Sequence, residues 1–229
     1  MSIARLDSWL AILSLTCLIP IWALAVASEE PKDTLEELRD RDYSIGSITP
    51  IYQELVRFSL PARFKHAYEK DSGSFYIEEF VPNGETVDTW SQMITVTGSK
   101  GLAANESATP QRLAEQVAAG IQRACPATFA AKAIGTLKIS SHDAFIGLVG
   151  CGEVKKGAPR SEIAMLITIK GTADYYSIQW AVRSTPVDRA PVLNGEEWLS
   201  RLKQLQPIRL CPRVPGESAP YPSCVNKKD

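Results

Sequence analysis

The chain has 229 residues, and its 25 Lys and Arg against 26 Asp and Glu give a net charge of −1 at pH 7. A near-neutral chain with singly scattered basic residues excludes nucleic acid as a partner, because phosphates demand a basic face. Hydrophobic residues make up 45% of the chain. That fraction is typical of a globular protein, and the length allows one domain with a substantial core.

The first 27 residues have the composition of an export signal. Arg5 gives a basic start, and no charge occurs from Ser8 to Ser28. The small-x-small pattern of residues 25–27 precedes an acidic pair, which predicts cleavage after Ala27. An uncleaved membrane anchor is the alternative, since the apolar run is long enough to span a bilayer. Pro20 and the small-x-small pattern of residues 25–27 favour cleavage. The mature chain is expected to be periplasmic or secreted, with no stable membrane span.

Four cysteines remain once residues 1–27 are removed: Cys125, Cys151, Cys211 and Cys224. In an exported chain they are expected to pair. Of the three connectivities we favour Cys125–Cys151 with Cys211–Cys224. The second pair closes a Pro-rich loop that has no backbone hydrogen bonds of a helix or sheet to hold it. Closing such a loop is worth about 3 kcal/mol. No Cys-x-x-Cys or His-x-His spacing occurs, so no metal and no cofactor are expected.

Composition divides the mature chain into three parts. Residues 28–50 form a charged leader, residues 51–210 a single domain, and residues 211–229 a C-terminal tail tied by the second disulfide. Alternating apolar residues bounded by turn residues predict strands over 55–60, 64–69, 74–81, 94–97, 133–139, 144–150, 162–169 and 175–182. The last four are joined by short connections, which predict antiparallel hairpins.

Three amphipathic helices are predicted between these strands. The first covers residues 85–93, the second begins at the cap residue Thr109 and ends at Ala124, and the third begins at a capping box over 194–197 and ends at Pro207. Their apolar faces are, in chain order, Val87, Trp90, Met93 and Ile94; Leu113, Val117 and Ile121; and Trp198, Leu199, Leu202 and Leu205.

This order predicts an α+β fold, an antiparallel sheet with helices packed on its faces. The short helix before strand 94–97, followed by helix 109–124 and a strand meander, resembles the PsbP/Mog1-like fold group. That group includes a lumenal photosystem subunit, a Ran-binding protein and bacterial envelope proteins of the DcrB kind. The resemblance covers residues 55–207 and implies binding or assembly in place of catalysis. It rests on element order, so no functional residue is carried over.

Three sets of residues invite a catalytic interpretation, and none is assigned one. Ser141-His142-Asp143 has the residue types of a nucleophile triad, but consecutive residues in a tight turn point apart. Glu78-Glu79 point to opposite faces of a strand. Glu196-Glu197 fall in a first helical turn, where the helix dipole favours negative charge. The other histidine, His66, is interpreted as a strand residue.

Aromatic residues give the candidate binding surface. Trp90 on the first helix and Tyr175 at a strand start are the predicted binding residues, because aromatic side chains dominate interfaces. Tyr176 and Trp180 share the other face of that strand and are expected in the core.

The sequence therefore predicts an exported, non-enzymatic binding or assembly protein of the cell envelope, with another envelope protein as its partner. One alternative is an immunity or inhibitor protein that acts against an exported toxin. The other is a small secreted hydrolase that uses His142 or His66 with a carboxylate.

Overall fold

The computed structural model describes residues 43–154 and 157–226. The predicted signal over 1–27 and the leader up to residue 42 lie outside the described residues. Within the described part of the chain, no helix has both the length and the apolar character that a membrane span requires.

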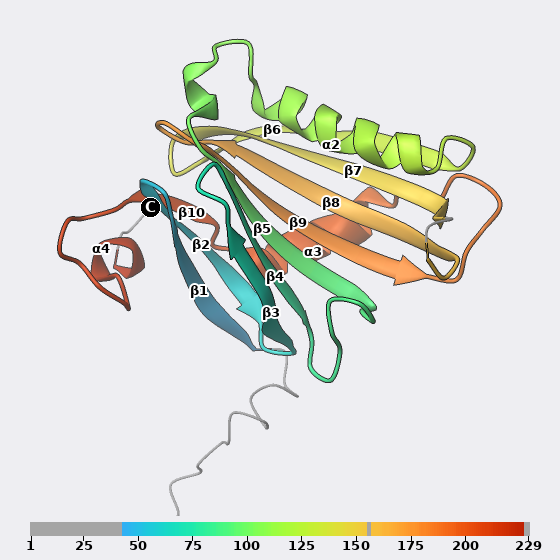
Figure 1. Ribbon diagram of the computed structural model, residues 1–229, viewed down its shortest axis with the longest axis horizontal. Helices are drawn as coiled ribbons and strands as arrows, with labels where there is room; N and C mark the ends of the chain where they lie inside the picture. The colour runs from blue at the N-terminus through green and yellow to red at the C-terminus, as the bar shows by residue number, and fades with distance from the viewer. Residues whose placement is uncertain (1–42, 155–156, 227–229) are drawn as a thin grey trace, which may run out of the picture. The chain divides into compact units, whose positions relative to one another are not determined.

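Seven antiparallel strands form the larger sheet, in the order β3-β4-β5-β9-β8-β7-β6 (Figure 1). They are β3 (Phe64–Asp71), β4 (Phe75–Pro82), β5 (Gln92–Ser99), β6 (Phe129–Ile139), β7 (His142–Val154), β8 (Arg160–Lys170) and β9 (Tyr175–Ser184). The two predicted hairpins, β6–β7 and β8–β9, are confirmed, and β7 and β8 also pair antiparallel. At the β6–β7 turn, Ser140 and Ser141 have φ of 49° and 70°, the positive values that a two-residue hairpin turn requires.

A smaller sheet has the order β1-β2-β10. Its strands are β1 (Ser44–Ile51), β2 (Glu54–Pro61) and β10 (Arg209–Pro212). β1 lies mostly inside the stretch 28–50 that the sequence assigns to a leader, so residues 44–50 of that stretch belong to the folded part. The reason is strand pairing, because β1 pairs along its whole length with β2. The expected tail likewise starts in an ordered strand, since Cys211 of β10 pairs with Leu55 of β2.

The main core lies between the two sheets and α3 (Gly195–Leu205). Phe58 of β2, Trp198 of α3 and Trp180 of β9 all belong to it, and each is at most 3% exposed. This confirms the expected core position of Trp180. The apolar face of α3 is narrower than predicted, because Leu199 is 42% exposed and only its other predicted members pack on the core.

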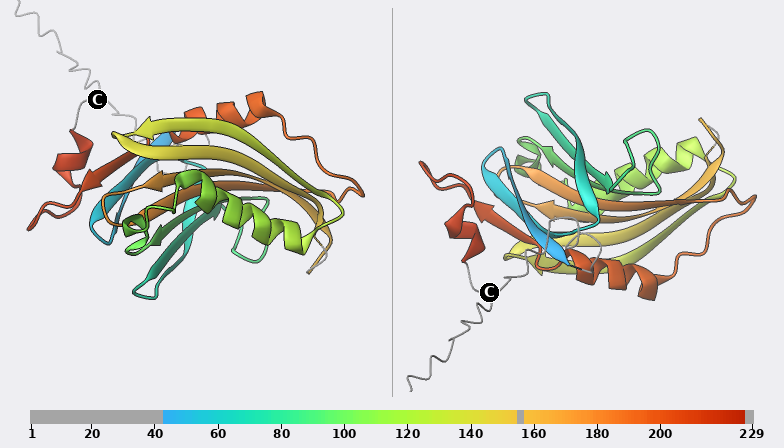
Figure 2. Two further views of the ribbon diagram at one scale, coloured as in Figure 1. Left: turned by 90° about the horizontal axis from the view of Figure 1, so that it is seen from above. Right: turned by 90° about the horizontal axis from the view of Figure 1, so that it is seen from below.

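The opposite face of the larger sheet carries α2 (Pro110–Ala124), so α2 and α3 lie on opposite faces (Figure 2). The residues of α2 that belong to the core beneath it are Ala114, Ala118 and Ile121. The predicted stripe is therefore partly wrong, since Val117 is 36% exposed and lies on the flank of the helix.

The predicted helix over 85–93 is wrong, because residues 83–91 form an irregular loop between β4 and β5. The hydroxyl of Thr86 accepts hydrogen bonds from the backbone N–H groups of Asp88 and Thr89, both at 3.3 Å. The carboxylate of Glu85 accepts from the backbone N–H of Ser91 at 2.6 Å. Such local side-chain bonds offer the backbone an alternative to the helical ladder.

Both predicted disulfides are confirmed. Cys125–Cys151 joins the C-terminal end of α2 to β7 with a Cα–Cα distance of 6.0 Å. Cys211–Cys224 joins β10 to the short helix α4 (Pro222–Val225) with a Cα–Cα distance of 5.7 Å. Two disulfides fit an oxidising compartment outside the cytoplasm.

One further short helix, η1 (Leu102–Ala104), lies between β5 and α2.

Candidate functional site

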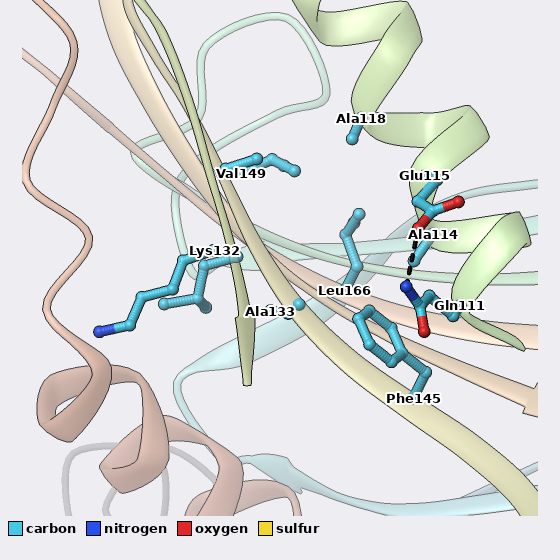
Figure 3. A pocket seen from close by; sticks show the side chains of 12 residues that line it. Gln111, Ala114, Glu115, Ala118, Lys132, Ala133, Phe145, Val149 and Leu166 are labelled. Atoms are coloured by element: carbon cyan, nitrogen blue, oxygen red, sulfur yellow. Dashed lines mark hydrogen bonds between the residues drawn. The ribbon is translucent and has the colours of Figure 1, made fainter. Parts of the chain in front are cut away.

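A groove of about 210 Å³ lies between α2 and the larger sheet, on the side of the edge strand β6. In Figure 3, Ala114 and Ala118 extend from α2 toward the sheet, opposite Phe145, Val149 and Leu166. The complete lining consists of Gln111, Ala114, Glu115 and Ala118 of α2; Ala131, Lys132 and Ala133 of β6; Phe145, Gly147, Leu148 and Val149 of β7; and Leu166 of β8.

The groove exists because the residues that face each other across it are small. Alternate residues of a strand share a face, so Ala131 and Ala133 lie together on the face toward α2. Their cross-strand partners on β7 are Val149 and Gly147. Across from them α2 presents Ala114 and Ala118, with Gln111 and Glu115 at the rim. A large side chain at Ala131 or Ala133, which are both exposed, would fill this space.

Polar groups lie at the rim of the groove. Gln111 donates a hydrogen bond from Nε2 to Oε1 of Glu115 at 2.8 Å, one turn along α2 (dashed in Figure 3). The amine of Lys132 points away from α2 in the same view. An adjoining cavity of about 340 Å³ shares Gln111 and includes Asp143 and Lys170 in its lining. An apolar floor with a polar rim is the composition of a protein interface.

The outer wall of the groove is a free strand edge. Among the strands that the structure describes, β6 is the last of the larger sheet and pairs only with β7, so N–H and C=O groups of alternate residues point away from the sheet. The stretch 129–133 keeps a regular register, which shifts only between Ala133 and Gly135. The opposite edge, β3, is instead rich in charged side chains, which discourage strand addition: Lys65, Glu69, Lys70 and Asp71.

Anchors at both ends fix α2 over the sheet. At its N-terminal end, the carbonyl of Pro110 accepts a hydrogen bond from Oγ1 of Thr168 at 2.7 Å. The carbonyl of Ala108 accepts one from the hydroxyl of Tyr175. At its C-terminal end, the Cys125–Cys151 disulfide bonds it to β7. The width of the groove is therefore set by contacts outside the groove itself.

The structure corrects the predicted binding residues Trp90 and Tyr175, because both lie in the interior. Tyr175 is 1% exposed and Trp90 is 8% exposed. The guanidinium of Arg183 lies 3.4 Å from the centroid of the Trp90 ring and covers it. The two faces of β9 are both covered, so Tyr175 is buried beside α2 while Tyr176 is buried on the other face. Sequence alternation alone does not show that both faces are covered.

Ser141 lies in the β6–β7 turn as predicted, whereas His142 and Asp143 are the first two residues of β7. Oδ1 of Asp143 contacts Nζ of Lys138 at 2.6 Å. Nε2 of His142 lies 3.8 Å from Oε1 of Glu54 on another strand. Ser141 is an exposed turn residue. The hydroxyl that meets this histidine and carboxylate belongs to Thr172 and not to Ser141, and it donates a hydrogen bond to Oε1 of Glu54 at 3.1 Å.

The second histidine belongs to a separate cluster on β3 and β4. Nε2 of His66 lies 3.7 Å from Oε1 of Glu78 and 3.8 Å from Oε2 of Glu69. Thr49 donates a hydrogen bond to Oε2 of Glu78 at 2.7 Å, and burial raises the pKa of Glu78 above its ordinary value. Glu79 lies on the other face of β4, as predicted. Among residues 43–154 and 157–226, no group of His, Cys, Asp and Glu is arranged to hold a metal ion.

A buried polar cluster that the sequence analysis missed ties β2 to the β8–β9 turn. Glu54 is 3% exposed, and its Oε1 accepts hydrogen bonds from the backbone N–H and the hydroxyl of Thr172 at 3.2 and 3.1 Å. Asp174 is 2% exposed and accepts from the backbone N–H of Gly101 at 2.7 Å. Burial, together with these two carboxylates, raises the pKa of Tyr176. The only signal in the sequence was an acidic residue beside an apolar strand.

No family model and no curated protein matches the sequence. Among solved structures, the chain is similar to a Bacteroides thetaiotaomicron protein at 13% identity and a TM-score of 0.42; the match covers 77% of this chain and about half, 51%, of that one. It is similar to the Saccharomyces cerevisiae Ran-binding protein Mog1p at 16% identity and a TM-score of 0.39, over 70% of this chain and 84% of that one. It is also similar to PsbP from Synechocystis at 9% identity and a TM-score of 0.40, over 71% and 87%. Two of these proteins, Mog1p and PsbP, give the PsbP/Mog1-like group its name, and this is the group that the element order resembles.

Proposed function

We propose that this chain is an exported binding or assembly protein of the cell envelope, and that the groove beside α2 receives an extended segment of a partner protein. The observation that carries the proposal is that a groove lined by small apolar side chains opens directly onto an unpaired strand edge. The predicted signal and the two disulfides support its place outside the cytoplasm.

Strand addition explains how both features act together. A partner segment that pairs with residues 129–133 of β6 gains backbone hydrogen bonds from the free edge. Every second side chain of that segment then points toward α2, because side chains alternate along a strand. Those side chains fill the space above Ala131 and Ala133, so the groove selects a segment with apolar residues at alternate positions.

Site-specific photo-crosslinking tests this proposal. The chain without residues 1–27 is prepared with a photo-reactive phenylalanine at Ala133, in the groove, or at Gln116, which is exposed on α2 and does not line the groove. Each is irradiated in envelope extract. We expect a stoichiometric crosslink to one protein at Ala133 and none at Gln116, with the crosslinked peptide extended and alternating in sequence.

A synthetic peptide of the crosslinked segment then provides the quantitative arm. Its affinity should fall at least about tenfold for Ala133→Trp, which fills the groove, and stay unchanged for Gln116→Trp. Equal crosslinking at both positions, or equal peptide affinity for both variants, would show that the groove is not the binding site. The identity of the partner distinguishes an assembly factor from the immunity or inhibitor alternative.

A further inference from the structure

A row of polar side chains crosses the larger sheet on the far side of α2 from the groove. Gln179 of β9 lies opposite Thr95 of β5, and Thr95 lies opposite Glu79 of β4. Glu79 in turn lies opposite Tyr68 of β3. Cross-strand partners share a face of the sheet, so these four side chains form one continuous row. We call it the polar row.

The polar row lies on the same face as α2 and directly beside it. Met93 and Ala181 are two positions along β5 and β9 from Thr95 and Gln179, and both belong to the core beneath α2. Leu166, the cross-strand neighbour of Gln179 on β8, lines the groove on the other side of the helix. The helix therefore separates an apolar groove from a polar surface.

The polar atoms of this row are available to a ligand. Gln179, Thr95 and Glu79 are half-buried. In the described part of the chain, their side chains make no hydrogen bond or ion pair with protein groups. The adjacent row differs, because Thr97 and Ser177 bond each other through their hydroxyls at 2.6 Å. Burial raises the pKa of Glu79 above its ordinary value, so its carboxylate is partly desolvated with no partner to compensate.

The row ends at the aromatic ring of Tyr68 on β3 and is bordered by Val117 at the α2 end. Tyr68 is 39% exposed at the β3 end. Val117 is 36% exposed on α2, on the helix flank that faces away from Gln111 and Glu115 at the groove. A ligand over the row would therefore meet polar groups beneath it and apolar surface at its ends.

We propose that the polar row binds a neutral oligosaccharide. The amide, hydroxyl and carboxylate together offer donors and acceptors that match sugar hydroxyls, and the Tyr68 ring offers a surface for the C–H face of a pyranose. Neighbouring strands are about 4.8 Å apart, a spacing comparable to the length of one linked pyranose ring. The row itself contains no Lys or Arg, so it does not select an anion.

A peptide fits this surface less well than it fits β6. The strands β4, β5 and β9 are paired on both sides, so their backbone groups are already used and strand addition has no free edge here. A ligand on the polar row must bond to side chains that rise from the sheet. A polyhydroxylated chain has hydrogen-bonding groups along its whole length and satisfies that condition.

Titration of the labelled chain with cellotetraose, maltotetraose and chitotetraose, followed by amide chemical shifts, tests the proposal. We expect at least one of the three to shift amides of β4, β5 and β9 with saturable behaviour. Gln179→Ala and Tyr68→Ala should each weaken that binding by about tenfold, the effect of losing one or two good contacts. Ala133→Trp, the groove variant, is the matched control and should bind the sugar as the unmodified chain does.

Two outcomes would overturn the assignment. One is the absence of saturable shifts with all three sugars while the spectrum shows a folded protein. The other is sugar binding that survives both Gln179→Ala and Tyr68→Ala, which would place the site elsewhere. Because Ala133→Trp blocks the groove without touching the polar row, failure of the groove proposal and failure of this one give different results.

Discussion

Removal of the Cys125–Cys151 disulfide should destabilise the protein more than removal of Cys211–Cys224. The two bridges join residues 26 and 13 positions apart. In the chain-entropy model, closing these loops contributes about 3.5 and about 2.9 kcal/mol to the free energy of unfolding. All four cysteines are at most 4% exposed, so the loss of buried sulfur is similar in the two double-alanine variants.

The position of the first bridge should enlarge the difference. Cys125 is the covalent link between α2 and the sheet, and Ala114 is the only residue of α2 that is fully buried. Without the link, the C-terminal half of the helix keeps only alanine and isoleucine contacts, which bury little apolar area. We expect the Cys125→Ala/Cys151→Ala variant to lose protection of its α2 amides, and the Cys211→Ala/Cys224→Ala variant to keep it.

Urea unfolding followed by tryptophan fluorescence gives the two free energies, and hydrogen exchange gives the local effect. The same preparations measure binding of the groove peptide, which should weaken only when the first bridge is absent. A larger loss of stability for the Cys211–Cys224 variant, or unchanged exchange of α2 amides in the Cys125–Cys151 variant, would refute the role given to this bridge.

Three further substitutions test local parts of the structure. Thr109→Ala removes the cap that accepts from the backbone N–H of Arg112 at 3.2 Å and should cost about 1 kcal/mol in thermal or urea unfolding, with Thr109→Ser as the neutral control. Gly152→Ala would bring a Cβ against the backbone carbonyls of Val187 and Arg189 and should cost about 1–3 kcal/mol; an unchanged midpoint would contradict the close approach. Burial raises the pKa of Glu79. The contribution of Glu79 to the free energy of unfolding is therefore complete at pH values below its pKa in the unfolded chain, and it is lost as the pH rises through its pKa in the folded chain. Glu79→Gln should therefore unfold at higher urea than the unmodified chain at pH 7, and the gain should vanish near pH 4; a gain that is equal at both pH values would contradict the burial argument.

The candidate site could be anticipated only in part. The run Ala130-Ala-Lys-Ala133 shows small residues at alternate positions of a strand, which is a signal for a thin, poorly filled face. Nothing local shows that β6 is an edge or that α2 lies beside it. The polar row could not be predicted either, because β9, which carries Gln179, is far along the chain from β4 and β5, which carry Glu79 and Thr95.

The sequence by itself determined the elements whose causes are local. Period-two alternation predicted β2 to β9 but neither β1 nor β10, Thr109 and Asn194 set two helix starts, and short turns set two antiparallel hairpins. The even number of cysteines and their spacing gave the disulfide pairing. These features depend on contacts between residues close along the chain, so composition and periodicity are sufficient to predict them.

Only the tertiary structure decided what covers each face of the sheet. The insertion of β9 beside β5 fixes the register that aligns the polar row. Tyr175 is 1% exposed, and its hydroxyl donates a hydrogen bond to the carbonyl of Ala108 in the segment before α2. Hydrogen bonds from side chains to the backbone in residues 83–91 stabilise a loop, although the spacing of apolar residues around Trp90 predicts a helix. Each outcome depends on pairing between distant segments or on a competing local bond, and neither leaves a periodic trace in the sequence.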